Sequence, residues 1–404
     1  MEFSLIEQLL DLPRIQISRI QQRDDEILIW VYISDGNHRC PRCNRYHKKV
    51  TEITEVKVRD LSIFGKKCYL IVRKGRIHCP CSYRGYEDLE FVDKYQKQTI
   101  RFNEFLFQLC DRMTIMDASE LMNVDWKRAY KTDRHTLEKL EASTPLPKMS
   151  VIGVDEISFE KYHRYFTIVY DLADNNGTLF VGKGRSEESL SAFFEQLSHH
   201  QRERINVVCM DMWDPYILSV HKSLPHADIV FDRFHLKKHL NQCIDQLRRA
   251  LVSQAPKDQK RFIKNKRWVL LKNKSNHTQK DKTALTELKD INSPLYEAYL
   301  VKEQFDHFFD YKYAKCAQRF LERWYREIPR EIKEYFRSFY QMFINYFNGI
   351  VTYFKYRITN AVAEGLNNKI KVLKRMAYGY RDPEYFKLKI LRRCGYLKNI
   401  KPVF

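Results

Sequence analysis

The chain has 404 residues, of which 44% are hydrophobic, so it is long enough to fold into two or three domains with at least one sizeable core. The 71 lysines and arginines exceed the 51 acids, and the formal net charge of +20 favours polyanionic partners such as nucleic acids. No stretch approaches the roughly 18 apolar residues of a membrane helix, and the N-terminus lacks a signal-peptide pattern, so we expect a cytoplasmic protein.

The N-terminal region combines a β pattern with clustered cysteines. Residues 25–95 alternate apolar and polar side chains between turn signals, which predicts a small β-rich domain over 1–95. Cys40 and Cys43, in the motif CPRC, form half of a zinc site, and Cys79 and Cys81 form a less regular second half. In a cytoplasmic protein such clustering favours a structural Zn²⁺ ion over disulfides. The alternatives are a metal-free β domain, or a site in which one thiolate is replaced by His38, His47 or His78.

A helical pattern follows over residues 99–141 and ends at the linker-like run 143–147, so we assign a helix-turn-helix domain to 96–147. Asn123 suits the positive φ of the turn, and Asp125 can cap the second helix. The basic residues Lys127, Lys131 and Arg134 share one face of that helix, as contacts to DNA do. A packed helical hairpin with a solvated basic face is the alternative.

Five short strand-like runs come next, with a helix-patterned segment, 187–199, between the third and the fourth. The runs are Val151–Val154, Tyr165–Tyr170, Thr178–Val181, Ile205–Met210 and Asp228–Phe231. Strands followed by alternating strands and helices predict a mixed α/β sheet. The pattern from 236 to 353 is helical and rich in aromatic residues, so we expect an α/β domain over 148–404 with a helical insertion at about 240–350.

Two apolar runs end in aspartate, at Asp155 and at Asp211. A carboxylate at the end of a buried strand can be aimed by a rigid backbone into a shared cleft, whereas a solvated turn residue is the simpler explanation for either one alone. Glu156 should face the opposite side of its strand, and Asp214 precedes a proline and suits a turn. Asp232 also ends a strand and is the main rival to Asp211.

Two histidines on the predicted helix after Asp232 offer a second kind of site. His235 and His239 are one helical turn apart, a spacing that is compatible with zinc.

The third candidate carboxylate is Glu364, on a helix-patterned segment near the end of the chain. An apolar stripe at helical spacing consists of Val362, Leu366, Ile370, Leu373 and Ala377. Glu364, Asn367 or Asn368, Lys371 and Arg375 lie on another face. A carboxylate among amides and cations is typical of a helix that touches both a metal ion and phosphate, although Glu364 could also be an ordinary exposed residue. Residues 350–404 hold 13 basic and three acidic residues, half of the net charge, which indicates a DNA-facing tail.

These motifs together resemble one family. The run NAVAEGLNNKIKVLKRMAYGY at 360–380, with VDE at 154–156, DMWDPY at 211–216 and DRFH at 232–235, is similar to the ISL-three group of insertion-sequence transposases. The resemblance covers nearly the whole chain, including the N-terminal zinc ribbon. It implies an RNase H-like catalytic domain in which Asp155, Asp211 and Glu364 are the DDE triad. Because DRFH belongs to the family pattern, we favour a structural or DNA-proximal role for His235 over a metal pair.

The resemblance also implies a reaction. Three carboxylates would hold two Mg²⁺ or Mn²⁺ ions, which suit oxygen ligands and catalyse phosphodiester cleavage. We expect a bacterial, nucleoid-associated transposase that cleaves element ends and joins them to target DNA. Its partners would be double-stranded DNA, at terminal inverted repeats and at the target, and a second copy in a homodimer; Asn367, Lys371 and Arg375 would contact DNA. The alternatives are a nuclease without strand transfer and a catalytically idle DNA-binding regulator. No arginine and histidine cluster supports a tyrosine recombinase.

Overall fold

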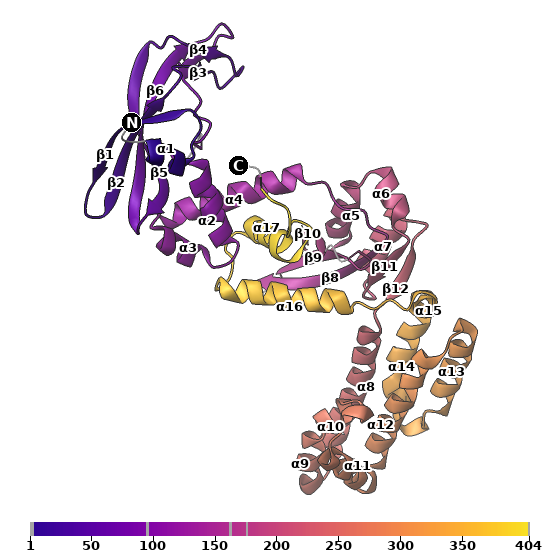
Figure 1. Cartoon of the computed structure of the whole chain (residues 1–404). Coiled ribbons are helices and arrows are strands. Elements are labelled where there is room, and N and C mark those ends of the chain that lie inside the picture. The colour runs from indigo at the N-terminus through magenta and orange to yellow at the C-terminus, as the bar shows by residue number, and fades with distance from the viewer. Residues whose placement is uncertain (1–3, 94–96, 161–163, 175–176, 403–404) are drawn as a thin grey trace. The chain divides into compact units, whose positions relative to one another are not determined.

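The computed structural model describes residues 4–93, 97–160, 164–174 and 177–402 (Figure 1). Contacts divide the chain into two units, one of residues 1–144 with 400–404 and one of residues 145–399. The division falls within the linker predicted at 143–147, and the domain boundaries placed at 95 and 147 stay predictions. Among the described helices, none has both the length and the apolar character needed to span a bilayer.

The first unit begins with a β-rich part, as its alternating pattern predicts. A five-stranded sheet has the order β1-β2-β6-β5, with β7 paired to β6, and a separate two-stranded ribbon joins β3 to β4. Its elements are α1 (Ser4–Leu10), β1 (Ile15–Gln22), β2 (Glu26–Ile33), β3 (His38–Arg39), β4 (Tyr46–His47), β5 (Glu52–Ile63), β6 (Lys66–His78) and β7 (Arg84–Tyr86). Alternate residues such as Leu70 and Val72 are fully buried, which gives the sheet its small core.

Three helices complete the first unit: α2 (Ile100–Cys110), α3 (Ile115–Met122) and α4 (Trp126–Ser143). Asn123 ends α3 with a φ of 51°, which is the left-handed conformation that the sequence predicts for the turn. Asp125 caps α4, because its side chain accepts a hydrogen bond from the backbone N–H of Lys127 at 2.9 Å. The helix-turn-helix geometry thus follows from two short polar residues.

The second unit is built on a mixed five-stranded sheet of the order β10-β9-β8-β11-β12. The strands are β8 (Val151–Glu160), β9 (Arg164–Asp171), β10 (Thr178–Lys183), β11 (Val207–Met210) and β12 (Asp228–Phe231). The pairs β10–β9 and β9–β8 are antiparallel, whereas β8–β11 and β11–β12 are parallel. β8 is therefore the central strand, and the mixed α/β class is confirmed.

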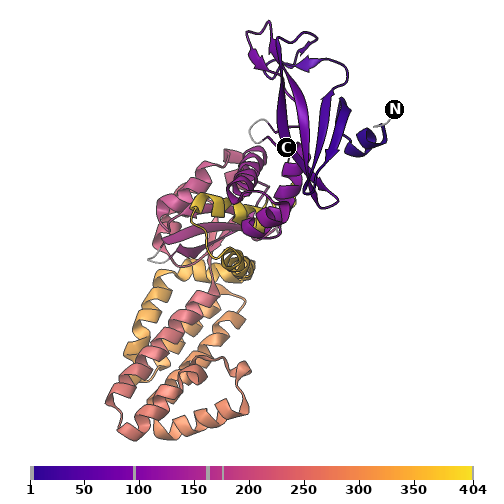
Figure 2. The same ribbon diagram turned by 90° about the vertical axis from the view of Figure 1, so that its left-hand side faces the viewer.

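Helices cover both faces of this sheet (Figures 1 and 2). On one face, α5 (Glu187–Glu195), α6 (His199–Arg204) and α7 (Asp214–Ser223) follow the strands, and Val154 and Val169 share a core with Phe193. On the other face lie α16 (Ala361–Met376) and α17 (Pro383–Cys394). Successive residues of a strand face opposite sides, so the residues of β8 that contact α16 alternate with those in the apolar core.

The helical insertion extends from α8 to α15, slightly beyond the predicted limits of 240 and 350. Its helices are α8 (Arg233–Gln254), α9 (Lys257–Asn265), α10 (Arg267–Leu271), α11 (Gln279–Ile291), α12 (Ser293–Phe305), α13 (Ala314–Glu327), α14 (Arg330–Asn345) and α15 (Phe347–Tyr356). α8 packs against α12 and α14, and α15 returns to β12.

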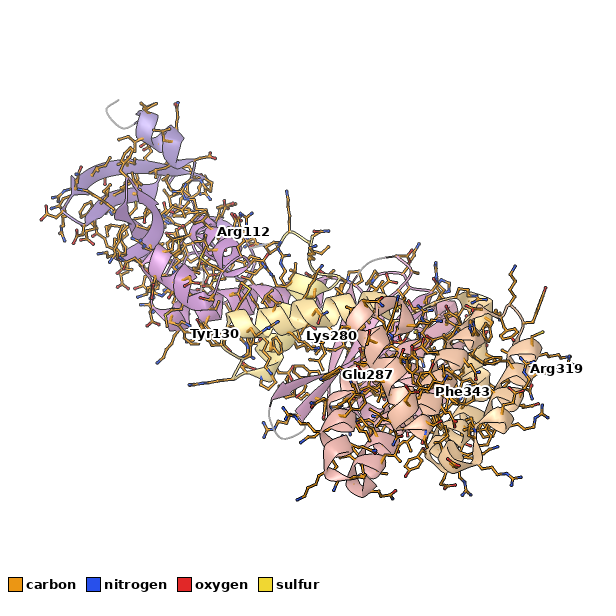
Figure 3. The ribbon with its side chains drawn as sticks, turned by 90° about the horizontal axis from the view of Figure 1, so that it is seen from below. Arg112, Tyr130, Lys280, Glu287, Arg319 and Phe343 are labelled. Atoms are coloured by element: carbon orange, nitrogen blue, oxygen red, sulfur yellow. The ribbon has the colours of Figure 1, made fainter. Side chains whose placement is uncertain are left out.

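An aromatic cluster holds the insertion together. The Phe305 ring is fully buried and lies 5.1 Å from the centroids of both Trp324 and Phe339. Phe343 lies inside the same bundle, whereas Arg319 projects outward from α13 (Figure 3). The aromatic residues are therefore core, as their helical spacing predicts.

Removal of one ring should test the importance of this cluster. We expect Phe305→Ala to lower the free energy of unfolding by about 3–5 kcal/mol, because it deletes a buried ring and leaves a cavity. Chemical denaturation followed by circular dichroism measures the change. The matched variant is Phe234→Ala, whose ring is 59% exposed on α8, and it should stay within about 0.5 kcal/mol of the unsubstituted chain. Equal losses in the two variants would contradict this assignment.

Candidate functional site

Three aspartates lie side by side where the parallel pairing of β8, β11 and β12 ends. Cys209 of β11 pairs with Gly153 of β8. Asp211 and Asp155 each come two positions after these paired residues, so they lie next to each other. Met210 pairs with Phe231, which places Asp232 beside Asp211 on the other side. The backbone N–H of Asp232 also donates to the Met210 carbonyl at 3.1 Å. The row consists of Asp155, Asp211 and Asp232, in that order.

The carboxylates of this row influence one another. Burial and the negative charge of Asp211 raise the pKa of Asp155 to about 6. Burial also raises the pKa of Asp232, and Asp211 again adds to the shift. Neighbouring carboxylates that are partly buried destabilise each other's ionised forms, and a divalent cation would relieve this repulsion. Their hard oxygen atoms fit the ligand preference of Mg²⁺ or Mn²⁺.

His235 joins the row from the first turn of α8. Its Nδ1 forms an ion pair with Oδ1 of Asp211. Burial lowers the pKa of His235, but the hydrogen bond and charge of Asp211 raise it more, so the net shift is upward. The Asp232 carboxylate caps the same helix, since it accepts the backbone N–H of Phe234 at 3.0 Å. Sequence reasoning left His235 outside the site, although the DRFH motif directly after a strand was the available signal.

Helix α16 crosses the central strand next to Asp155. A Cβ atom on Gly153 would lie 2.9 Å from Oδ1 of Asn360, so glycine allows this close approach. One helical face turns to the sheet, with Ala363 fully buried and Asn367 7% exposed. Nδ2 of Asn367 donates to Oδ2 of Asp155 at 2.6 Å. Asn367 therefore binds protein groups in this structure, and the DNA contact that the sequence predicts for it stays a prediction.

The other candidates on α16 are exposed. Glu364 lies about one turn before Asn367, but its side chain is exposed to solvent and does not belong to the buried face of the helix. Within the described residues, the cysteine cluster is the one group of three or more possible metal ligands whose atoms lie within 4.8 Å of one another. The strand register thus places Asp155 and Asp211 next to each other, whereas among the described residues Glu364 forms no group of this kind with them. Lys371 and Arg375 are exposed farther along the helix.

Two rivals from the sequence point away from the row. Glu156 forms an ion pair with Arg185 at 3.5 Å, and its strand position faces the side opposite Asp155. Asp214 accepts a hydrogen bond from the Tyr346 hydroxyl at 2.7 Å. Both acids therefore have partners outside the row, and Asp214 begins α7 rather than lying in the turn that the sequence suggests.

A separate candidate metal centre lies in the first unit. The Sγ atoms of Cys40, Cys43, Cys79 and Cys81 all lie within 4.8 Å of one another. Two of the separations, Cys40–Cys81 and Cys43–Cys79, are 3.7 and 3.5 Å, close to the roughly 3.8 Å between sulfurs that tetrahedral Zn–S bonds of about 2.3 Å require. Burial raises the pKa of Cys40, but backbone N–H groups of Cys43 and Arg42 outweigh it and bring the pKa to about 7. The cluster fits a structural zinc ion.

The histidines considered as zinc ligands take other positions. His38 pairs through Nδ1 with Glu87 at 2.8 Å, and the four sulfurs already supply a complete ligand set. The irregular spacing of the second cysteine pair is accommodated by a positive φ of 69° at Ser82, next to Cys81.

The predicted DNA-contacting residues of α4 surround one hollow. Its volume is about 750 Å³, and its lining residues are Lys97, Asp125, Lys127, Arg128, Lys131, Arg134, His135 and Glu138. Arg134 pairs with Glu138 at 2.8 Å and also donates to the Tyr130 hydroxyl. Arg128 adds a basic group that sequence reasoning missed because it lies one position off the predicted face.

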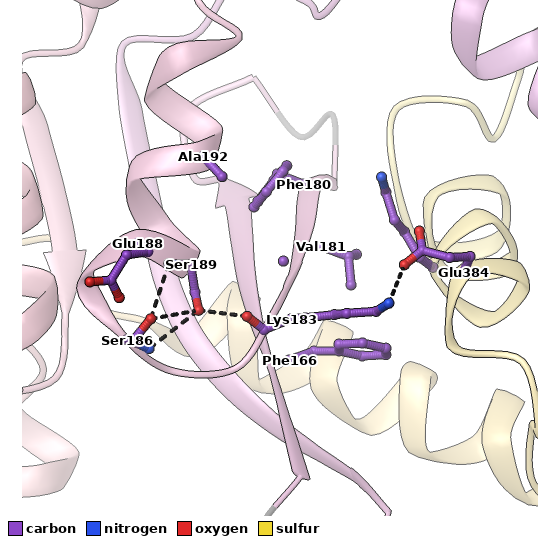
Figure 4. Close-up of a pocket in the computed structure, with 11 residues that line it drawn as sticks. Phe166, Phe180, Val181, Lys183, Ser186, Glu188, Ser189, Ala192 and Glu384 are labelled. Atoms are coloured by element: carbon purple, nitrogen blue, oxygen red, sulfur yellow. Dashed lines mark hydrogen bonds and ion pairs between the residues drawn. The ribbon is translucent and has the colours of Figure 1, made fainter.

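A second hollow, of about 420 Å³, lies beside the edge strand β10, between α5 and α17 (Figure 4). The ion pair of Lys183 with Glu384 closes one side at 2.8 Å. Phe166 and Phe180 contribute apolar walls. None of the three aspartates lines this hollow, so it is separate from the candidate catalytic row.

Comparisons with known proteins agree with this architecture. The family model for the DDE domain of ISL3 transposases matches residues 152–390. A zinc-finger model of the transposases of IS204, IS1001, IS1096 and IS1165 matches residues 36–81, and a helix-turn-helix model of transposase family ISL3 matches residues 87–130.

Whole relatives are similar as well. The chain is 32% identical, over 355 residues and 87% of each chain, to the transposase for insertion sequence element IS1001 of Bordetella parapertussis. It is 24% identical to the transposase for IS1557 of Mycobacterium tuberculosis, over 86% of this chain and 83% of the relative. The mixed sheet is thus an RNase H-like fold, and the matched helix-turn-helix and transposase domains imply DNA as a partner. The chain belongs to the ISL3 family of insertion-sequence transposases.

Proposed function

We propose that this transposase cleaves DNA at the ends of its insertion sequence and transfers the freed strands into target DNA, as a homodimer on paired ends. The observation that carries the proposal is the row of carboxylates where the parallel pairing of β8, β11 and β12 ends, with α16 crossing next to it. Asp155 and Asp211 are adjacent in that row, and Glu364 lies on the crossing helix. A site of this kind serves both hydrolysis and strand transfer.

In the proposed mechanism, Asp155, Asp211 and Glu364 would hold the catalytic Mg²⁺ or Mn²⁺. When bound, the metal would activate the attacking oxygen, water or 3′-hydroxyl, and stabilise the leaving oxygen. His235 orients Asp211 through their ion pair. Lys371 and Arg375 are exposed on α16 and would bind the phosphate backbone, which keeps the scissile phosphodiester beside the carboxylates.

Substitution of the three carboxylates tests the catalytic assignment. We expect Asp155→Asn, Asp211→Asn and Glu364→Gln each to slow end cleavage and strand transfer by about 100-fold or more, because an amide removes the charge that holds the metal. Binding to the element ends should stay unchanged. Asp214→Asn is the matched control, since Asp214 is exposed and bonded to Tyr346. Normal cleavage by Glu364→Gln would overturn the triad, and Asp232→Asn would then identify the alternative ligand.

The competing function is DNA cleavage without strand transfer. Both reactions would use the same carboxylates, so an assay of strand joining distinguishes them. Precut element ends with a free 3′-hydroxyl bypass cleavage and report joining alone. Joined products that depend on Asp155 support a transposase, whereas cleavage of intact ends together with no joining of precut ends supports a nuclease.

We also propose that the cysteine cluster binds one zinc ion that stabilises the β-rich part of the first unit. Protein purified without chelators should contain about one zinc per chain, and Cys40→Ser should lose it together with much of the thermal stability of this unit. Elemental analysis and thermal unfolding measure the two effects. Cys316→Ser, which changes an exposed cysteine on α13, should alter neither. Absence of zinc from the freshly purified protein would refute the proposal.

The basic hollow of α4 is our candidate for recognition of the element ends. The triple variant of Lys127, Lys131 and Arg134 to alanine should bind DNA more weakly. Its plot of log K against log salt should become shallower by about 0.9 for each phosphate contact removed. The control is the triple alanine variant of three exposed lysines of α11, namely Lys280, Lys282 and Lys289. Equal affinity and equal salt slope in the two variants would place recognition elsewhere.

A further inference from the structure

Two donors hold the Asp155 carboxylate, one on each oxygen. Oδ1 accepts the backbone N–H of Glu156 at 2.8 Å, and Oδ2 accepts Nδ2 of Asn367 at 2.6 Å. The first donor belongs to the same strand, whereas the second comes from a helix 212 positions later in the chain. The orientation of Asp155 therefore depends on how α16 lies against β8.

Tyr170 in turn fixes the amide of Asn367. Its hydroxyl donates to Oδ1 of Asn367, and its ring is fully buried on β9, where Tyr170 pairs with Gly153. Burial, with the charge of Asp155, raises the pKa of Tyr170 well above its usual value, so the hydroxyl keeps its proton and remains a donor. A flipped amide would turn its oxygen toward the Asp155 carboxylate, where two acceptors would face each other. One amide orientation satisfies both partners.

Packing alone does not require this chain of hydrogen bonds. Asn367 continues the face of α16 that begins with Asn360 and Ala363, at the point where Gly153 lets the helix approach the strand. An apolar side chain at position 367 would need no polar partner, whereas a buried amide destabilises the fold unless both its ends are bonded. A buried tyrosine hydroxyl has the same need. The presence of a buried amide and a buried hydroxyl here is therefore explained better by the orientation of the Asp155 carboxylate than by the stability of the fold.

We propose that Asn367 and Tyr170 are positioning residues, which hold the Asp155 carboxylate in the orientation that binds the catalytic metal ion. The assignment rests on the function proposed above, since it takes Asp155 to be a metal ligand. In this role the two residues act through Asp155, and neither needs to touch the metal. Groups that orient a metal ligand in this way typically change metal affinity or activity by about 10- to 100-fold when they are removed.

The test is a titration of the full-length, DNA-free protein with Mn²⁺, followed by electron paramagnetic resonance. Tyr170→Phe deletes a single oxygen atom and should weaken Mn²⁺ binding by about 10-fold, and Asn367→Ala should weaken it by up to about 100-fold. In cleavage assays both variants should need more Mn²⁺ for half-maximal rate, and the rate should largely recover at saturating metal. A loss of folded protein would instead lower the maximal rate at every metal concentration.

Tyr216→Phe provides the matched control. Tyr216 is also buried, at 1% exposure, and its hydroxyl bonds to Thr167 at 2.8 Å, so the substitution removes an equivalent buried hydrogen bond away from Asp155. It should share any loss of thermal stability with Tyr170→Phe but keep the Mn²⁺ affinity. If Tyr170→Phe and Asn367→Ala also keep that affinity, the positioning role is wrong.

Asp155→Ala separates this inference from the function on which it rests. If Mn²⁺ binding and cleavage survive Asp155→Ala, the proposed catalytic site itself is wrong. If Asp155→Ala abolishes both while Asn367→Ala leaves both unchanged, the catalytic site stands and only the positioning role falls. Loss of Mn²⁺ affinity in the order Asp155→Ala, Asn367→Ala, Tyr170→Phe supports the two proposals together.

Discussion

The parallel register of β8, β11 and β12 is the constraint on which the candidate site depends. The three strands run in the same direction, so Asp155, which lies in β8 beyond its pairing with β11, and the acids directly after β11 and β12 form a row of three. These acids repel one another. Their partial burial also raises the pKa values of Asp155 and Asp232, which disfavours the ionised carboxylates. The fully buried apolar residues beneath them, such as Val154 and Met210, supply the packing that holds the strand ends together against this repulsion.

Each aspartate of the row is matched with a donor from a different element. Asp211 faces His235 of α8, and Asp155 faces Asn367 of α16. Asp232 receives the backbone N–H of Phe234 at the start of α8. Because a partly buried carboxylate is stabilised by such partners, the row accounts for the cap at the start of α8 and for the amide that α16 presents to the sheet. The carboxylates of the row and the helices that pack around them therefore depend on the same contacts.

The sequence could predict that Asp155 and Asp211 follow buried strand residues because each ends a short apolar run, although a solvated turn residue is the simpler explanation for either one alone. It could not predict the buried face of α16. Helical spacing favoured an apolar stripe that includes Val362, but Val362 is 44% exposed and Asn367 is buried instead. The reason is that this helix packs against Gly153 and a charged residue, where a small side chain and an amide fit better than a branched one. Hydrophobic periodicity identifies the buried face of a helix only where the facing surface is apolar.

The relation of His235 to the row escaped prediction for a similar reason. A histidine pair at helical spacing suggests a metal site by itself, and only the three-dimensional register shows that His235 meets the acid of a neighbouring strand. The zinc cluster shows the opposite case. Four cysteines in two short motifs are specific enough that their convergence is expected despite the irregular spacing of Cys79 and Cys81, and the structure brings all four together.

The long insertion between Asp211 and Glu364 need not disturb the site, because it leaves and returns at the same strand. α8 starts directly after β12, with Asp232 as its cap. At the other end α15 lies on β12, where a Cβ atom on Gly349 would come within 2.4 Å of the Phe231 ring. Lys355 and Tyr356 then bind the carboxylate of Asp228 at 2.8 and 2.6 Å, at the start of that strand. With both of its ends fixed to one strand, the insertion can be large while the chain re-enters α16 next to the carboxylates. This anchoring explains how residues more than 200 positions apart, Asp155 and Asn367, meet at a hydrogen-bond distance.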